Sequence, residues 1–90
     1  MPYFLIERQF DRQLVPPLDG VAELKLINDD EDVRWVFSFL SIDRTKTYCL
    51  YEAQSADAIR AAAARAGVPA DAVIELAGRV LPSGELVGTE

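Results

Sequence analysis

Two glutamates and the single cysteine are the side chains best suited to chemistry in this chain of 90 residues. Glu7, Cys49 and Glu52 all lie in segments rich in aromatic and β-branched residues, where strands are expected. Carboxylates and a thiol can bind a metal ion, and a carboxylate enclosed by rings can act as a general base. The chain has no histidine, which removes the most common metal ligand and every histidine-based triad. From the residues alone, Glu7 and Glu52 are candidates for a general base or for the polar groups of a ligand pocket, whereas a cysteine in mid-strand is most often a small buried apolar residue.

Three aromatic residues alternate along the segment from Arg34 to Leu40. Because successive side chains of a strand point to opposite faces, Trp35, Phe37 and Phe39 are expected to share one face. An alanine-rich helix is expected to cover the other face, which leaves the three rings uncovered. Exposed rings of this kind mark a surface that binds a partner or a ligand. The pattern predicts a homodimer in which sheet packs on sheet, a ligand pocket between two such sheets, or both.

The pairing of this strand with the next one decides which residues join the rings. If the intervening loop turns about Asp43 and Arg44, three cross-strand pairs follow: Phe39 with Tyr48, Phe37 with Leu50, and Trp35 with Glu52. A register slipped by one residue would bring Cys49 and Tyr51 to this face instead. On the first strand, Glu7 is expected on the same face. The predicted ligand-binding residues are Glu7, Trp35, Phe37, Phe39, Leu50 and Glu52.

The segments that must position these residues alternate between strand and helix patterns. In order, they are a strand at 2–8, a helix at 18–27, strands at 33–40 and 47–53, a helix at 56–66 and a strand at 73–76, followed by 79–81 and 85–87 as a terminal hairpin or a tail. This order is βαββαβ with a tail, the pattern of ferredoxin-like folds. We expect one α+β domain over residues 1–90, a ferredoxin-like βαββαβ sandwich in which two helices cover one face of a four-stranded antiparallel sheet.

Both predicted helices have sequence signals at their ends. Two prolines at 16–17 fit the start of the first helix, where a missing N–H is tolerated. That helix is expected to end near Asn28, because the four acids at 29–32 would oppose the helix dipole in a last turn. Ser55 suits the N-cap of the second helix, and Gly67 suits its end.

Composition restricts the classes of function and location. Fifteen acids against nine bases give a formal charge of −6, which disfavours binding to nucleic acid and to anionic membrane surfaces. A single cysteine allows no internal disulfide and fits a reducing compartment. No secretory signal pattern opens the chain, and no apolar run approaches the roughly 20 residues of a membrane span. We expect a cytoplasmic protein with no nucleic-acid partner and no membrane partner.

Four runs taken together resemble one family of proteins. They are FLIER at 4–8, RWVFSF at 34–39, TYCLYEA at 47–53 and AGVPAD at 66–71. The combination resembles the small bacterial nickel-responsive, nickel-binding proteins, and the similarity is strongest between Arg34 and Glu75. The resemblance implies a ferredoxin-like fold, a homodimer and, in some members, nickel as the bound metal.

Two positions depart from the pattern of that family. Its members commonly carry a histidine where this chain has Phe37 and a tyrosine where it has Phe39. Both departures remove polar side chains from the same face, and imidazole is a ligand that suits nickel. A site built from the carboxylates of Glu7 and Glu52, with Cys49, would favour magnesium, calcium or manganese instead.

These observations favour a homodimeric binding protein for a small apolar molecule or a metal ion over an enzyme. The alternative is a small enzyme similar to the cofactor-free monooxygenases, with its substrate against the rings and Glu7 or Glu52 as the base. A third interpretation takes Pro2, exposed by removal of the initiator methionine, as the base of a tautomerase.

Overall fold

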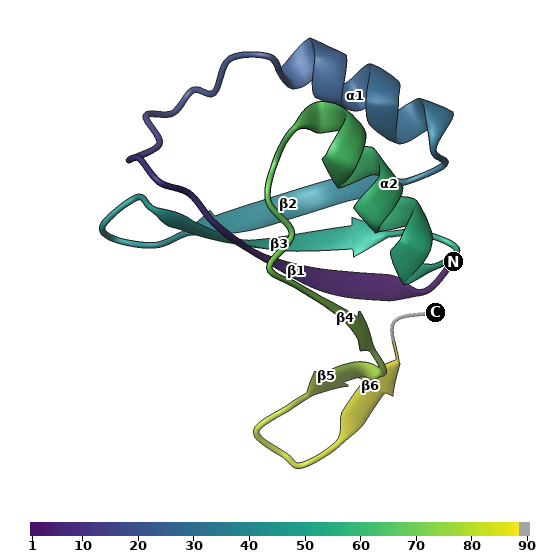
Figure 1. Cartoon of the computed structure of the whole chain (residues 1–90). Coiled ribbons are helices and arrows are strands. Elements are labelled where there is room, and N and C mark those ends of the chain that lie inside the picture. Colours follow the sequence, from purple (N-terminus) through teal and green to yellow (C-terminus); the bar gives the residue numbers. More distant parts are fainter. Residues whose placement is uncertain (89–90) are drawn as a thin grey trace.

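Two helices cover one face of a four-stranded antiparallel sheet in the computed structural model, which describes residues 1–88 (Figure 1). Along the chain the elements are β1 (Tyr3–Gln9), α1 (Val21–Asp30), β2 (Arg34–Leu40), β3 (Lys46–Glu52), α2 (Ala56–Ala66), β4 (Ala72–Leu76), β5 (Gly78–Val80) and β6 (Leu86–Gly88). The sheet has the strand order β2-β3-β1-β4, so β2 and β4 are its edges. This arrangement confirms the α+β, ferredoxin-like sandwich predicted from the sequence.

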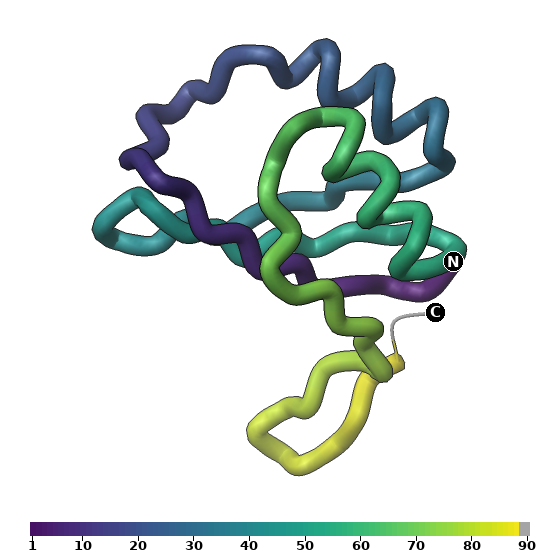
Figure 2. The backbone as a smooth tube through the Cα atoms, in the orientation of Figure 1, coloured from purple at the N-terminus to yellow at the C-terminus, as the bar shows by residue number. Residues whose placement is uncertain are grey.

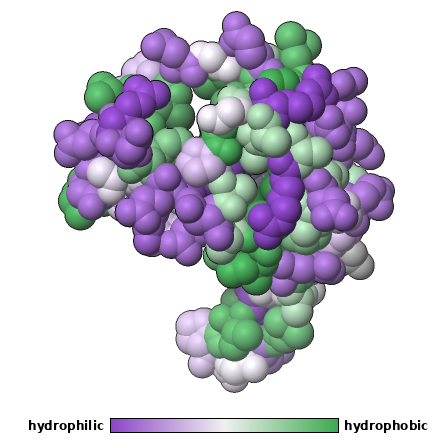
Figure 3. Space-filling model, viewed as in Figure 1, coloured by the Kyte–Doolittle hydropathy of each residue, from purple (hydrophilic) through white to green (hydrophobic). Residues whose placement is uncertain are grey.

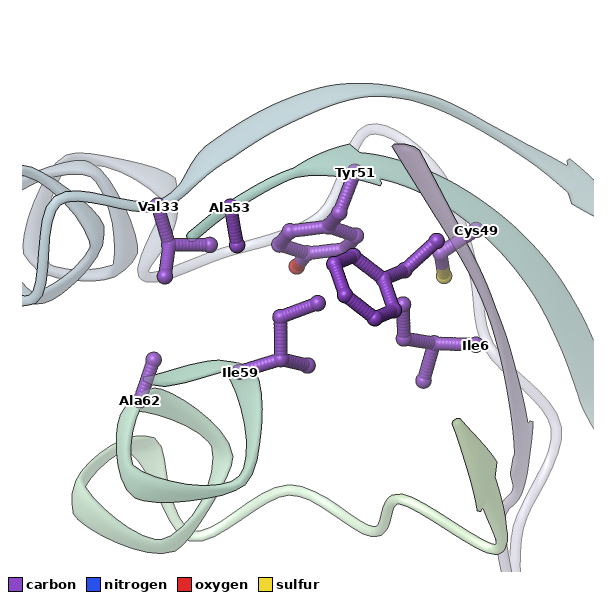
Figure 4. Packing of buried hydrophobic residues seen from close by; sticks show 8 residues of the cluster. Ile6, Val33, Cys49, Tyr51, Ala53, Ile59 and Ala62 are labelled. Atoms are coloured by element: carbon purple, nitrogen blue, oxygen red, sulfur yellow. The ribbon is translucent and has the colours of Figure 1, made fainter. Parts of the chain in front are cut away.

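The core lies between the sheet and α2. Phe4 and Ile6 of β1 point inward and are at most 1% exposed. Cys49 and Tyr51 of β3 point to the same side, and Ile59 of α2 reaches this cluster from the helix (Figure 4). Full burial of a large apolar side chain contributes about 1.5–3 kcal/mol. This cluster therefore determines which face of the sheet the helices cover.

Helix α2 begins and ends as the sequence predicts. The Ser55 hydroxyl accepts a hydrogen bond from the backbone N–H of Ala58 at 3.2 Å, and Gly67 ends the helix in the left-handed region at φ 69°. Between these caps, the small residues Ala62 and Ala63 are buried. Their short side chains let the helix lie close to the sheet.

Helix α1 differs from the prediction at its start. It begins at Val21 and not at Leu18. Gly20 occupies the N-cap in the left-handed region at φ 74°, and no side-chain hydrogen bond caps the helix. The two prolines therefore lie in the loop before the helix. This loop, residues 10–20, forms a long arch between β1 and α1 (Figure 2).

The same helix also extends further than predicted, because cations compensate its acidic end. It runs through Asp30 and not only to Asn28, so acids lie in its last turn. Lys25 lies 2.9 Å from Asp29, and Arg65 of α2 lies 2.6 Å from Asp30. Arg65 comes from the other helix, so the helix dipole alone does not determine where α1 ends. Within residues 1–88, no helix has the length and apolar content needed to cross a membrane.

The turn between β2 and β3 is the one on which the predicted register depended. Two of the predicted pairs are present: Phe39 with Tyr48 and Phe37 with Leu50. In the turn, the Asp43 carboxylate accepts a hydrogen bond from the Ser41 hydroxyl at 2.6 Å and another from the Thr45 hydroxyl at 2.8 Å. The hydrogen bond from Ser41 is the main reason why the pKa of Asp43 is lowered. The charged form of Asp43 thus stabilises the turn.

A bulge in β2 changes the third predicted pair. It lies between Trp35 and Phe37 and adds one residue to the strand. As a result Trp35 lies opposite Tyr51, and Arg34 lies opposite Glu52. The predicted pair of Trp35 with Glu52 is wrong, and the indole packs against the core on the helix-covered side.

The end of the chain forms the predicted hairpin. Among the strands of residues 1–88, β5 and β6 pair only with each other as a two-stranded sheet, which projects from the end of β4 away from the helices (Figure 1). Gly78 is required at its base, because a Cβ atom there would collide with the backbone carbonyl of Val87. The hairpin exposes apolar side chains, among them Val80 at 74% and Leu86 at 60%.

Candidate functional site

The uncovered side of the sheet, which we call the open face, presents side chains from all four strands. In the middle of the sheet Leu5 lies opposite Leu50 on one neighbouring strand and opposite Ile74 on the other. Phe37 extends this row onto the edge strand, opposite Leu50. Phe39 adds a second ring beside it, with the ring centroids 5.3 Å apart and edge to face. One continuous apolar row therefore crosses the whole sheet.

Much of this row is in contact with solvent in a single copy. Phe39 is 65% exposed, Ile74 is 51% exposed and Phe37 is 47% exposed. Single exposed apolar residues are normal on proteins, but contiguous apolar surface marks a place where something binds. The open face is therefore a candidate binding surface, as the alternation of aromatic residues predicted.

Two ion pairs lie on the open face among the apolar residues. Lys46 lies 2.7 Å from Glu7, and Arg34 is paired with Glu52. The hydrogen bond to the Glu7 carboxylate, together with its charge, raises the pKa of Lys46. Glu52 lies opposite Tyr3, four residues from Glu7 along β1, which corresponds to about 13 Å at about 3.3 Å per residue. The two carboxylates therefore occupy separate positions.

The structure divides the predicted site residues between the two faces of the sheet. Five of the six predicted ligand-binding residues lie on the open face, whereas Trp35 lies on the covered face and donates a hydrogen bond to the Ser38 hydroxyl at 2.8 Å. Cys49 is only 4% exposed on the covered face, away from Glu7 and Glu52. Across residues 1–88 there is no group of three or more His, Cys, Asp or Glu side chains placed to hold a metal ion. A single copy does not bring the three predicted metal ligands together.

A pocket that the sequence did not predict lies on the covered face, under the loop of residues 10–20 and α1. This inner pocket has a volume of about 330 Å³, and the surface is hollowed beside that loop (Figure 3). Its walls are mainly apolar, with Phe10, Leu14, Leu18, Leu24, Trp35 and Val68 among them. Its polar groups include Arg8, Ser38, Thr47 and Tyr51. A mainly apolar cavity with a few polar groups is typical of small-molecule sites.

The outer wall of the inner pocket is anchored to the turn between β2 and β3. The backbone N–H of Phe10 donates to the carbonyl of Thr45 at 2.8 Å, and that of Leu14 donates to the carbonyl of Arg44 at 2.7 Å. Leu14 is directed inward and is only 6% exposed. The first part of the loop is therefore fixed against the sheet.

Arg8 places a buried positive charge at the inner pocket, because its side chain is only 6% exposed. Its guanidinium donates to the carbonyl of Pro69 and to the hydroxyl of Tyr51, the latter at 3.3 Å, and lies 5.6 Å from the centre of the Tyr51 ring. Burial raises the pKa of Tyr51, so its hydroxyl stays neutral. None of the ion pairs found in the described part of the chain includes Arg8.

A signal for this buried arginine was present in the sequence. Phe4 and Ile6 are expected to point inward, and Arg8 continues the same period of two along the strand. Arg8 by itself, however, is typical of a charged residue in contact with solvent at the end of a strand. The pocket itself depends on the path of the loop of residues 10–20, which no local pattern indicates.

The model of the family described as nickel-responsive proteins like SCO4226 matches residues 4–76, which contain both faces of the sheet and leave out the terminal hairpin. The crystal structure of SCO4226 from Streptomyces coelicolor A3(2) is similar, with a TM-score of 0.66 and 23% sequence identity over 82% of this chain and 94% of that chain. At that identity the likeness supports the shared fold alone. No curated protein matches the chain.

Proposed function

The chain belongs to the family of nickel-responsive proteins like SCO4226, and from its open face we propose that it is a homodimeric binding protein for a small ligand. Two copies meet through their open faces, and the ligand lies between the sheets against Phe37, Phe39 and Leu50. The observation that carries this proposal is the contiguous apolar row across the open face, in which Phe39 is 65% exposed.

A second copy is a suitable partner for this face because the face carries both signs of charge. A two-fold axis brings the same patch of each copy together, so each patch must be complementary to itself. The net charge of −6 opposes self-association in general. On the open face, however, Glu7 is matched by Lys46 and Glu52 by Arg34. This face therefore offers apolar contact without a local excess of negative charge.

The proposed ligand is apolar rather than a nickel ion. The residues of one copy do not fit a nickel site, because the chain has no histidine and Cys49 lies on the other side of the sheet from the glutamates. Both glutamates are already engaged by cations. The rings therefore supply most of the contact surface, and Glu7 and Glu52 orient any polar group of the ligand.

The dimer is tested by light scattering after size exclusion on wild-type protein, Phe39→Asp and Leu26→Asp. Leu26 is a matched control, since it is 70% exposed but lies on α1. We expect a dimer for the wild type and for Leu26→Asp, and a monomer for Phe39→Asp, because a carboxylate within the interface would be buried without a partner. A wild-type protein that stays monomeric at all accessible concentrations would overturn the homodimer.

The ligand class is tested by calorimetry with nickel on the wild-type protein and on Glu7→Gln. Glu23→Gln serves as the control, because Glu23 is an exposed glutamate of α1. We expect no saturable heat from nickel with any of the three proteins. Nickel binding that is lost in Glu7→Gln and kept in Glu23→Gln would replace the apolar ligand by a metal ion.

A further inference from the structure

The buried charge of Arg8 is incompletely compensated inside the protein. A charge removed from water is stabilised by an opposite charge and by hydrogen bonds to its remaining donors. The groups found on the Arg8 guanidinium are a carbonyl, a hydroxyl and a ring, all of them neutral. A guanidinium has five N–H donors, and these contacts use only part of them. Within residues 1–88 no carboxylate completes the pair.

The inner pocket supplies the space in which a counter-ion would lie. Arg8 is part of its lining, and the cavity of about 330 Å³ is at the lower end of the range for small-molecule sites. Thr47, Ser38 and Tyr51 also line the cavity on the side of the sheet. Most of the remaining wall is apolar, apart from exposed polar residues of the loop. The site therefore combines one polar end with an apolar remainder.

The remaining charges of the lining belong to exposed residues. Arg12 and Asp19 are both solvent-exposed and carry opposite charges. They lie in the loop of residues 10–20 and are accessible to water, which screens their charges. Arg8 is therefore the charge that decides what binds in the interior of the pocket.

From these observations we propose that the inner pocket binds a small amphipathic carboxylate, with its carboxylate on Arg8 and its apolar body against Trp35 and the leucines of the loop. The planar guanidinium presents paired N–H donors that match the two oxygens of a carboxylate. A single buried cation neutralises a single negative charge, so a monoanion fits better than a dianion. A cation is excluded by Arg8, and a neutral amide would leave the charge uncompensated.

This site is independent of the dimer interface proposed above. Arg8 and Trp35 point to the covered face, whereas Phe37 and Phe39 point to the open face on the other side of the same sheet. The proposal does not rest on the existence of a dimer. Either proposal can fail while the other holds.

The test compares two ligands of equal shape on the full-length wild-type protein, 3-phenylpropanoate and its neutral amide. Trp35 is the only tryptophan of the chain, so its fluorescence reports on the pocket without a label. We expect saturable binding of the carboxylate with one site per chain, and binding of the amide that is weaker by roughly tenfold or more, as loss of a charged hydrogen bond implies. Equal affinity of the two compounds, or no binding of the carboxylate, would overturn the proposal.

The position of the charge is tested with Arg8→Met, which keeps an unbranched apolar stem and removes the guanidinium. We expect this variant to bind the carboxylate no more tightly than the amide. Arg60→Met is the matched control, because Arg60 is an exposed arginine of α2 outside the pocket lining, and it is expected to bind as the wild type does. If Arg8→Met does not fold, Arg8→Lys keeps the charge and should bind the carboxylate more weakly while still preferring it to the amide. Full wild-type affinity in Arg8→Met would place the anion elsewhere and overturn the proposal.

The monomeric variant Phe39→Asp separates this inference from the proposed dimer. We expect it to bind 3-phenylpropanoate as tightly as the wild type. If Phe39→Asp loses the carboxylate while Arg8→Met keeps it, the ligand lies on the open face, which overturns the inner-pocket site and supports the proposed function.

Discussion

The two faces of the sheet place two neighbouring charges in opposite environments. Glu7 and Arg8 are adjacent on β1, but Glu7 points to the open face and Arg8 to the covered face. Glu7 meets Lys46 at 2.7 Å near solvent, whereas Arg8 is 6% exposed and meets only neutral groups among the described residues. An exposed ion pair contributes little, since water and salt screen it, but a buried charge without a counter-ion is costly. Burial, and not residue type, therefore distinguishes a solvent-exposed charge such as Glu7 from a buried charge such as Arg8, which is a candidate for binding a ligand.

The phenylalanines show the same contrast between the two faces. Phe4 is 1% exposed in the core, whereas Phe39 is 65% exposed on the open face. Identical side chains thus belong to the core in one place and to a candidate binding surface in the other. Both residues belong to one sheet, in which only β3 separates the strand of Phe4 from the strand of Phe39, and the two roles differ because the side chains point to opposite faces.

The largest expected effect is the difference in stability between two single variants, Phe4→Ala and Phe39→Ala. We expect Phe4→Ala to lower the free energy of unfolding by about 3–5 kcal/mol, because it leaves a cavity in the core. Phe39→Ala in a single copy should cost much less, since its ring is already hydrated. Urea unfolding followed by circular dichroism, at a low and a high protein concentration, measures both changes.

The concentration dependence separates two explanations if the two losses prove similar. A loss for Phe39→Ala that grows with protein concentration would mean that a second copy buries the ring, as the proposed dimer requires. Similar losses at every concentration would contradict the assignment of Phe39 to an exposed face.

The titration of Tyr51 tests the burial of the covered face, because it makes stability depend on pH at high pH. Burial is the main cause that raises its pKa above the ordinary value of 10.0, although Arg8 acts in the opposite direction. Above pH 10 the unfolded chain loses this proton while the folded chain keeps it, so the associated stability is present below pH 10 and is lost as the pH rises through the raised pKa. The decline is at most about 1.4 kcal/mol per pH unit for one group.

Tyr51→Phe is the control for that titration, because it keeps the ring and removes the ionisable hydroxyl. Urea unfolding between pH 9 and pH 11 should show a shallower decline for Tyr51→Phe than for the wild type. Parallel declines would show that Tyr51 does not titrate differently in the folded and unfolded chains, and would argue against its burial beside Arg8.

The fold was largely predictable from the sequence because its signals are local. Ser55 and Gly67 mark the ends of α2 by their own chemistry, and the turn about Asp43 determines the register of Phe37 and Phe39. Alternation along the first strand correctly separated Glu7, on the open face, from Phe4 in the core. Each of these features depends on residues close together in the chain, which is why pattern alone was sufficient.

The parts that were not predicted depend on contacts between distant segments. No residue type in the run from Arg34 to Ser38 marks the bulge that turns Trp35 inward. The end of α1 depends on Arg65, which comes from the other helix. The inner pocket depends on the arch of residues 10–20, which is tied to the β2–β3 turn. The candidate site on the open face could be derived from periodicity, but the pocket on the covered face could not.

The two helices on the covered face also differ from each other in how far their side chains are buried. Helix α2 buries three residues against the sheet, whereas α1 has a single buried residue, Asn28, and leaves Leu26 70% exposed. Helix α2 therefore packs tightly on the sheet. Helix α1 covers the sheet loosely, above the inner pocket. Changes to the two helices should differ accordingly.

Ser55→Ala removes the N-cap of the tightly packed helix. We expect a loss of about 1 kcal/mol in the free energy of unfolding, because the backbone N–H of Ala58 loses its acceptor. Ser83→Ala is the control: its hydroxyl also accepts from a backbone N–H, that of Glu85 at 3.4 Å, but in an exposed turn of the projecting hairpin and not at a helix end, so stability should change by less than about 0.5 kcal/mol. Equal effects in urea unfolding would mean that the cap does not stabilise α2.

Arg65→Ala tests the attachment of the loosely packed helix and has the smallest expected effect. Arg65 joins α2 to the end of α1 through Asp30 at 2.6 Å and Glu31 at 2.8 Å, but these ion pairs are open to solvent. We therefore expect a loss smaller than that of Ser55→Ala, and one that disappears at high salt because mobile ions screen exposed charges. Arg60→Ala, an exposed arginine of α2 with no ion pair among the described residues, should show no such salt dependence. A loss in Arg65→Ala that persists in 1 M salt, where the screening length is about 3 Å, would mean that Arg65 acts through packing and that α1 is held more firmly than its exposure indicates.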